Sequence, residues 1–260
     1  MTSLAFTKTG DGPPLVLLHG IGGSRAAWRP VLDRLAATHT VYAVDLPGHG
    51  DSPGPGGAPR HLAQAVSAAL DERGIDVPHV AGNSLGGWVA VELAALRPVA
   101  SLTLLSPAGF WQRAQPAYCT VVLLGIRLGC RFAGRPLAAL CRWAWGRRLV
   151  FRQVCARPEL LSPDDARRSI TAMGRCPGFR DTFRAVRPLR CEPAAGLTVP
   201  VTVAFGDADR ILLARQSRFT GGLPAHTRHL PLPGAGHVPM SDDPGLIART
   251  VLVTTGAVAR

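Results

Sequence analysis

The chain has 260 residues, of which 47% are hydrophobic and 18% are charged, and its formal net charge is +12. These values are typical of a globular protein with a sizeable core. No run of about 18 uninterrupted apolar residues occurs, which argues against a membrane-spanning helix. The first residues lack the basic and apolar regions of a secretory signal, so we expect a cytoplasmic protein.

The positive charge and the cysteines are confined to the middle third of the chain. Residues 107–190 hold 16 arginines against four acidic residues, whereas the rest of the chain is neutral. Arg127, Arg131 and Arg135 recur every fourth residue, which predicts one basic stripe on a helix. No Cys/His spacing typical of zinc occurs, so we expect no metal site and buried free thiols rather than disulfides. The cysteines are Cys119, Cys130, Cys141, Cys155, Cys176 and Cys191.

Strands and helices are predicted to alternate in the two outer parts of the chain. Apolar runs rich in β-branched residues predict strands at 14–19, 40–45, 78–83, 101–106 and 201–206, and helices are expected at 25–37, 60–73, 85–96, 212–220 and 244–253. This alternation is typical of a mostly parallel sheet with helices on both faces. Ligands of such sheets bind beyond the carboxyl ends of the strands.

The middle of the chain breaks this rhythm and predicts a helical insertion. The run 121–154 has a helical pattern that is interrupted near Gly134 and Pro136. A further helix is expected after Ser162, with this serine as N-cap, Pro163 in the first position and acidic residues in the first turn.

Polar residues suited to chemistry follow the predicted strands. The segments are HGIGGS (19–24), DLPGHGDSP (45–53), GNSLG (82–86), GDADRI (206–211) and PGAGHVPM (233–240). Ser84, at the centre of GNSLG, has two interpretations. It is the N-cap of the following helix, or it lies on a strained strand-to-helix turn with its hydroxyl exposed for attack. The spacing of the glycines does not decide between them.

The order of serine, aspartate and histidine in these segments resembles that of the α/β-hydrolase family, over residues 4–253. The resemblance implies that Ser84 is the nucleophile and that His237 is the base that activates it. The G-x-x-D pattern implies that Asp209 is the acid that orients the imidazole, with Asp207 as its rival.

The resemblance also implies an oxyanion hole made of backbone N–H groups. Leu85, the residue after the nucleophile, supplies one donor, and Ile21 in the HGIGG segment supplies the other, with Gly22 as the alternative. His19 and His49 match family positions that hold loops together rather than transfer protons.

The implied fold is α/β, an α/β-hydrolase core with a mostly parallel central sheet and an inserted helical cap over the active site. The core is expected at 1–107 and 192–260, and the cap at 108–191. Caps of this family largely select the substrate. Trp111, Trp143 and Trp145 are candidates for the substrate pocket, and the alternative is that they pack the cap helices together.

A serine nucleophile argues against the haloalkane dehalogenase and epoxide hydrolase branches, which use a carboxylate. The sequence therefore predicts a serine hydrolase that cleaves a small or medium carboxylic ester through an acyl-enzyme, with no metal or organic cofactor. The same residues are compatible with hydrolysis of thioesters, lactones or the carbon–carbon bond of a dienoic diketone, and with acyl transfer. A non-catalytic binding protein is disfavoured by the complete set of Ser84, Asp209 and His237.

The basic cap has three interpretations. It is a solvated outer face, which we favour, or it steers anionic substrates, or it contacts an anionic membrane surface. No nucleic-acid-binding module is recognisable, so we expect no nucleic-acid partner. The expected partner is a small ester or acyl compound, anionic under the second interpretation.

Overall fold

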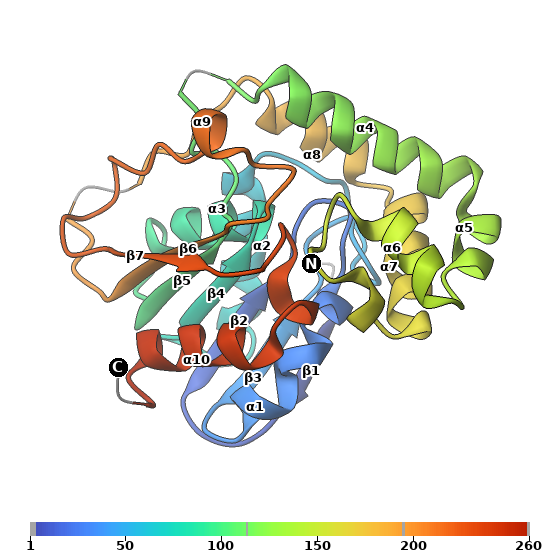
Figure 1. Cartoon of the computed structure of the whole chain (residues 1–260). Helices are drawn as coiled ribbons and strands as arrows, with labels where there is room; N and C mark the ends of the chain where they lie inside the picture. The colour runs from blue at the N-terminus through green and yellow to red at the C-terminus, as the bar shows by residue number, and fades with distance from the viewer. Residues whose placement is uncertain (1–3, 113, 194–195, 259–260) are drawn as a thin grey trace.

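A twisted sheet forms the centre of the molecule (Figure 1). The computed structural model describes residues 4–112, 114–193 and 196–258, and within them the sheet has seven strands in the order β1-β3-β2-β4-β5-β6-β7. The strands are β1 (Phe6–Thr9), β2 (Pro14–Leu18), β3 (Thr40–Val44), β4 (His79–Asn83), β5 (Ser101–Leu105), β6 (Val201–Gly206) and β7 (Arg228–Leu232). Only the β1–β3 pair in this part of the chain is antiparallel, so the predicted mostly parallel sheet is confirmed.

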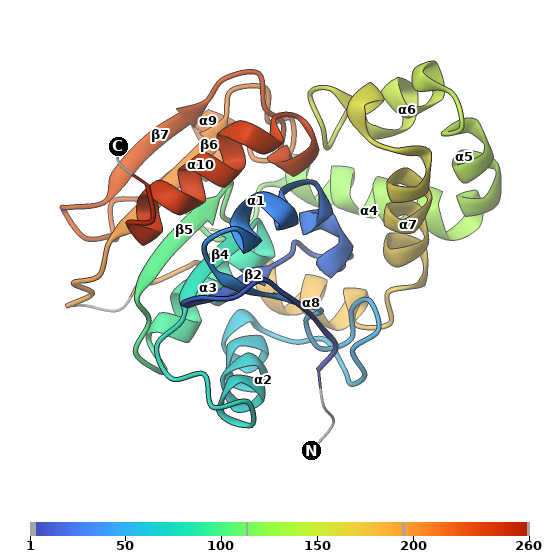
Figure 2. The ribbon, with the colours of Figure 1, turned by 90° about the horizontal axis from the view of Figure 1, so that it is seen from below.

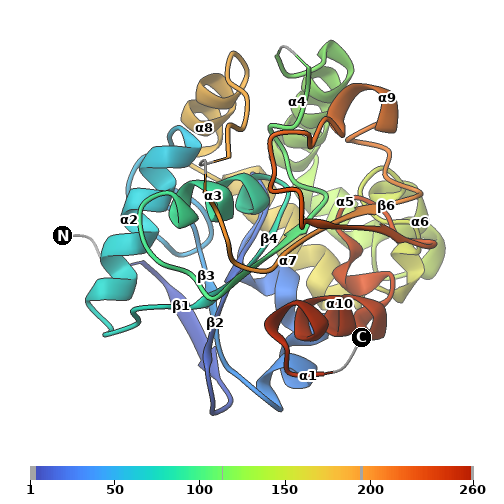
Figure 3. The same cartoon turned by 90° about the vertical axis from the view of Figure 1, so that its left-hand side faces the viewer.

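Helices cover both faces of the sheet because successive side chains of each strand point to opposite faces. Leu15 and Leu17 of β2 belong to the buried cluster on one face, and Val16 and Leu18 belong to the cluster on the other. The first face is covered by α1 (Leu32–Ala36) and α10 (Pro244–Thr255), and the second by α2 (Pro59–Asp71) and α3 (Leu85–Ala94). Figure 3 shows these two helical layers on either side of the sheet.

Several elements differ from the sequence prediction, among them the antiparallel edge strand β1 (Phe6–Thr9), which was not predicted. The expected helix at 25–37 begins as a 3₁₀ helix, η1 (Arg25–Val31), because Pro30 lacks the N–H group that an α-helix needs. The expected helix at 212–220 is shorter in the structure, where α9 spans only Ala214–Ser217. Strand β7 was not predicted, since RHLPL is polar and contains a proline.

The insertion between β5 and β6 forms a separate group of helices beside the sheet (Figure 2). These are α4 (Ala117–Phe132), α5 (Gly134–Leu140), α6 (Ala144–Phe151), α7 (Pro163–Arg175) and α8 (Phe179–Val186). The predicted interruption falls at Ala133, between α4 and α5. The predicted N-cap of α7 is confirmed, because Ser162 Oγ accepts a hydrogen bond of 3.0 Å from the Asp165 amide.

The turn from β4 into α3 is packed closely against its neighbours. A Cβ atom at Gly82 would overlap the Gly86 carbonyl oxygen, and a Cβ atom at Gly86 would overlap the Leu18 carbonyl oxygen of β2. Both glycines are therefore required by the close approach of the backbones, and helix α3 can start directly above the neighbouring strand.

We predict that Gly86→Ala destabilises the fold by about 3 kcal/mol or more, because α3 or β2 has to move to admit the methyl group. The free energy of unfolding in urea measures this effect. Gly125→Ala is the matched control, since Gly125 lies in helix α4 with nothing within 4 Å of its added Cβ. That substitution should be neutral or stabilise by about 0.5–1 kcal/mol. Equal losses in both variants would contradict the packing argument.

Candidate active site

Ser84 lies at the junction of β4 and α3 in a strained conformation. Its φ is 55° and its ψ is −117°, values that a non-glycine residue rarely adopts. Ser84 occupies the N-cap position of α3, but its side chain makes no capping hydrogen bond to that helix, so side-chain capping does not account for this serine. The backbone is held in place from both sides, since the Ser84 N–H donates to Leu105 and its carbonyl accepts from Gly87.

The structure joins His237 and Asp209 in a buried pair. His237 Nδ1 donates to Asp209 Oδ2 over 2.9 Å, and the two side chains are 5% and 0% exposed. The other oxygen of Asp209 accepts the amides of Ile211 and Leu212 at 2.8 and 2.9 Å. Asp207 is exposed and binds the amide of Gly234 instead, so the rival acid of the sequence prediction is not beside the imidazole.

The Asp209 carboxylate stays charged although it is buried. Burial raises its pKa, but His237 and the amides of Ile211 and Leu212 outweigh this effect, and the net pKa lies below the usual value. At neutral pH the carboxylate can therefore accept a hydrogen bond from the Nδ1–H group of the imidazole, which leaves Nε2 free as an acceptor.

Asn83 was not singled out by the sequence analysis, yet it ties this histidine to the nucleophile turn. Its Nδ2 donates to the His237 carbonyl at 2.9 Å and to the Leu105 carbonyl at 3.0 Å, and the side chain is buried. The residue that precedes Ser84 thus also fixes the backbone of the histidine loop. The only sequence signal was a buried-strand position occupied by an amide.

Ser84 and His237 line the same cavity, which holds about 1170 Å³ of empty space including its open mouth. Among the described residues Ser84 Oγ has no hydrogen-bond partner, and no hydrogen bond joins it to His237 Nε2. Hydrogen bonds between such groups are often loose without substrate. Ser84 and His237 therefore face one cavity, but no hydrogen bond connects their side chains.

Two backbone amides beside Ser84 are free to bind a ligand oxygen. Ile21 and Leu85 line a recess together with Ser84. Neither amide donates to another group in the part of the chain that the structure describes. A Cβ atom at Gly20 would lie 3.2 Å from Ser84 Cβ, so the loop that carries Ile21 passes directly over the serine.

The walls of the cavity are mainly apolar and come from both the core and the cap. Apolar side chains of the cap that line it are Leu123, Ile126, Val150, Phe151, Val154, Leu161, Ile170 and Met173. Asp165 is the one carboxylate in the lining found among the described residues. Cys130 and Cys155 also line it, and burial raises the pKa of both thiols, that of Cys130 to about 11, so neither is a thiolate at neutral pH.

Two of the three tryptophans proposed for the pocket lie elsewhere. Trp143 and Trp145 are 50% and 58% exposed, and their rings stack on each other 6.2 Å apart on the outside of the cap. The prediction failed because α6 turns Val150 and Phe151, and not Trp143 or Trp145, toward the cavity. Trp111 is buried and lines the recess beside Ser84, while its Nε1 donates to the Leu189 carbonyl.

The predicted basic stripe is also incomplete. Arg127 points inward, where its guanidinium donates to the Met173 and Cys176 carbonyls and lies over the Phe179 ring. Arg131 and Arg135 are exposed. The first arginine of the pattern therefore packs the cap helices together instead of facing solvent.

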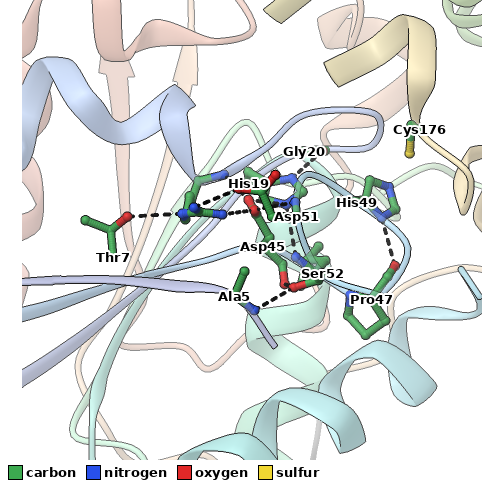
Figure 4. A network of polar contacts seen from close by, with 12 residues as sticks. Ala5, Thr7, His19, Gly20, Asp45, Pro47, His49, Asp51, Ser52 and Cys176 are labelled. Atoms are coloured by element: carbon green, nitrogen blue, oxygen red, sulfur yellow. Dashed lines mark hydrogen bonds and ion pairs between the residues drawn. The ribbon is translucent and has the colours of Figure 1, made fainter. Parts of the chain in front are cut away.

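A buried polar network holds the loop that carries Ile21 (Figure 4). His19 Nδ1 donates to the Gly20 carbonyl at 2.7 Å, and its Nε2 accepts the Leu46 amide at 3.1 Å. Asp45 accepts the Arg25 amide and guanidinium, and also the Asp51 amide. Burial lowers the pKa of His19 despite the nearby Asp45 carboxylate, so the ring is neutral.

His49 completes this network from the next loop. Its Nδ1 donates to the Pro47 carbonyl at 2.9 Å, and its ring lies 5.5 Å from that of His19. Burial, reinforced by His19, lowers the pKa of His49 to about 3. The positions of both histidines fit the loop-holding role expected for them, since neither lines the cavity of Ser84.

The comparisons with known proteins agree with this arrangement at the level of the family. The model of the alpha/beta hydrolase family matches residues 15–250, so the chain belongs to the α/β hydrolase family and is a hydrolase. The epoxide hydrolase EphH of Mycobacterium tuberculosis is 35% identical over 205 residues, which cover 75% of this chain and 92% of that protein.

Other similar proteins differ in the reaction that their names give. A pimeloyl-[acyl-carrier protein] methyl ester esterase of Aeromonas hydrophila is 40% identical over 109 residues, which cover 41% of each chain. The enol-lactonase of Burkholderia xenovorans superposes with a TM-score of 0.77 at 21% identity, over 97% of this chain and 96% of that one. The structural likeness shows the fold alone.

We predict that Asn83→Ala lowers the hydrolase activity at least tenfold, because the His237 carbonyl loses its donor and the histidine loop shifts. The activity of Asn83→Asp should fall equally, since aspartate has the size of asparagine but no side-chain N–H group. Thr254→Val, which removes a buried hydrogen bond to Thr202 far from the cavity, controls for lost stability. Full activity in Asn83→Asp would contradict the positioning role.

The pKa of His49 predicts a specific pH dependence of stability. The unfolded chain binds a proton near pH 6.5 and the folded one only near 3, so the stability is complete above 6.5 and is lost as the pH falls toward 3. The slope is at most about 1.4 kcal/mol per pH unit for this group. His49→Asn, which keeps a donor for Pro47, should flatten urea-unfolding stability between pH 6.5 and 4. His229→Asn, at an exposed position, is the control and should leave the pH dependence of the unfolding free energy unchanged. An unchanged pH dependence in His49→Asn would contradict the role given to His49.

Proposed function

We propose that the protein is a serine hydrolase that cleaves small or medium carboxylic esters through an acyl-enzyme. Ser84 is the nucleophile, His237 the general base and Asp209 the residue that orients the imidazole. The observation that carries this proposal is Ser84 itself, strained and uncapped, facing the same cavity as a histidine held by a buried carboxylate.

Acylation follows from the direction of each group. As Ser84 Oγ attacks the carbonyl carbon of the ester, its proton passes to His237 Nε2, and Asp209 stabilises the imidazolium. The oxyanion accepts hydrogen bonds from the amides of Ile21 and Leu85, which is typically worth about 3–4 kcal/mol per donor in the transition state. When the tetrahedral intermediate collapses, the alcohol leaves with the proton from His237.

Deacylation uses the same groups with water in place of serine. His237 takes a proton from a water molecule that attacks the acyl carbon, and returns it to Ser84 as the carboxylic acid leaves. A strained serine backbone suits both steps, since it keeps Oγ in front of the amides throughout.

The similarity to a protein named epoxide hydrolase does not change the proposed reaction. Attack of a serine on an epoxide carbon would form an ether, which has no carbonyl group for water to attack, and the enzyme would stay alkylated. A carboxylate nucleophile avoids this by forming an ester. Ser84 therefore favours acyl chemistry, and the name of the methyl ester esterase relative is in keeping with it.

The lining of the cavity supports an uncharged acyl chain as the substrate part bound there. Its walls are apolar, and the single carboxylate in the described lining, Asp165, is ion-paired with Arg29, so the described lining offers no unpaired charge to an ionic substrate. The arginines of the cap do not line this cavity. We therefore favour neutral alkyl or aryl esters over the anionic substrates considered from the sequence.

A fluorophosphonate tests the nucleophile directly. Intact mass should show one adduct on the wild type, none on Ser84→Ala, and labelling at least a hundredfold slower on His237→Ala, because the alkoxide can no longer form. Ser169→Ala is the matched control, since that serine also lines the cavity. Labelling that survives in Ser84→Ala, or none on the folded wild type, would refute the proposal.

The kcat/KM values for a panel of p-nitrophenyl esters of increasing chain length then show which acyl chain lengths the cavity accepts. We predict that Ile126→Trp, which fills the cavity from α4, lowers kcat/KM for long chains at least tenfold more than for acetate. Val121→Trp, on the outer face of the same helix, should leave the profile unchanged. Labelling without turnover of any ester would favour the carbon–carbon hydrolase or acyltransferase alternatives.

A further inference from the structure

The outer face of helix α4 is apolar and exposed to solvent. Its exposed large side chains are Tyr118, Val121, Leu124, Leu128 and Phe132, which recur at helical spacing along the full length of the helix. Val121 is 68% exposed and Phe132 is 78% exposed. A continuous apolar row of this kind on the surface of a domain indicates an interaction site.

The inner face of the same helix is apolar as well. Leu123, Ile126 and Cys130 line the active-site cavity. A helix on the surface of a globular protein normally has one polar face, and a helix that is apolar all round is normally covered on all sides. Helix α4 therefore has an outer face that no other described part of the chain covers.

Positive charge surrounds this face. Residues 117–158 contain eight arginines and no acidic residue. The exposed arginines Arg131, Arg135, Arg142 and Arg152 make no ion pair with any carboxylate in the described part of the chain. The surface around α4 to α6 thus combines exposed apolar side chains with uncompensated positive charge.

Exposed aromatic side chains also occur farther along the cap. Trp143 and Trp145 stack at the start of α6, and Arg142 lies over the Trp143 ring at 5.2 Å. Tryptophan and arginine side chains are favoured where an apolar phase meets water, because each has an apolar body and a polar or charged end.

The length of α4 fits a helix that lies in a membrane surface better than one that crosses it. Sixteen residues span about 24 Å, less than the roughly 30 Å of a bilayer core. No single described helix is long and apolar enough to cross a membrane, and α4 and α5, which together would be, are bent by 92° at their junction.

We propose that the outer face of α4, together with the exposed arginines of residues 131–152, docks the protein on an anionic lipid surface. The apolar row enters the boundary between headgroups and acyl chains, and the arginines bind the acidic headgroups. Because the inner face of α4 lines the cavity, docking brings the active site to the lipid surface. A second copy of this chain is a poorer occupant of the face, since it would bring two sets of unpaired arginines together.

Vesicle co-sedimentation tests docking without reference to catalysis. The full-length protein should bind vesicles of phosphatidylcholine with 30% phosphatidylglycerol, and at least tenfold more weakly vesicles of phosphatidylcholine alone. Val121→Glu and Leu128→Glu should each lower the binding at least tenfold. The double variant Arg131→Gln/Arg135→Gln should lower it about fivefold per arginine and weaken its salt dependence.

Val77→Glu is the matched control. Val77 is also an exposed valine, but it lies just before β4, outside the cap helices. Its vesicle binding should equal that of the wild type. The fluorophosphonate labelling rate of Val121→Glu should also be unchanged, which separates failure of docking from failure of the proposed hydrolase function. No binding to anionic vesicles by the wild type, or equal losses in Val121→Glu and Val77→Glu, would overturn the proposal. A stable dimer that Val121→Glu dissociates would overturn it in favour of self-association.

Discussion

The close contact between the β4–α3 turn and strand β2 is the constraint on which the site depends. Gly82 and Gly86 have no Cβ, so helix α3 starts directly over the sheet and Ser84 is held at a positive φ. That conformation lifts Oγ out of the helix start, where a serine would otherwise bind a backbone amide. The same turn places Asn83 where its amide fixes the histidine loop, so one stretch of backbone sets the positions of both reacting side chains.

Much of this arrangement was predictable from the sequence because it depends on local chemistry. Ser84 and Asp209 each follow a buried strand, and the carboxyl ends of parallel strands meet at one edge of a sheet, whereas His237 was placed only by its late glycine-rich loop. The choice between Asp209 and Asp207 depended on which carboxylate turns inward, and the amides of Ile211 and Leu212 decide it in the structure. Sequence spacing gave only a preference there.

The cap was predictable as a group of helices but not in its orientation. Trp143 and Trp145 were placed in the pocket because large aromatic residues usually lie inside, yet α6 turns other residues inward. Arg127 likewise points into the cap. Which face of a cap helix is buried is set by its neighbours, and the exposed apolar row on α4 shows that hydrophobicity alone does not decide it.

The proposed mechanism requires a covalent acyl group on Ser84. Rapid-quench mass spectrometry during the first turnover of a p-nitrophenyl ester measures it, because deacylation by water is then caught before completion. We expect an acyl adduct on the peptide that contains Ser84. The adduct should form together with the burst of nitrophenol and then be lost at the steady-state rate. Ester turnover with no adduct at any time, or an adduct on another residue, would contradict this mechanism.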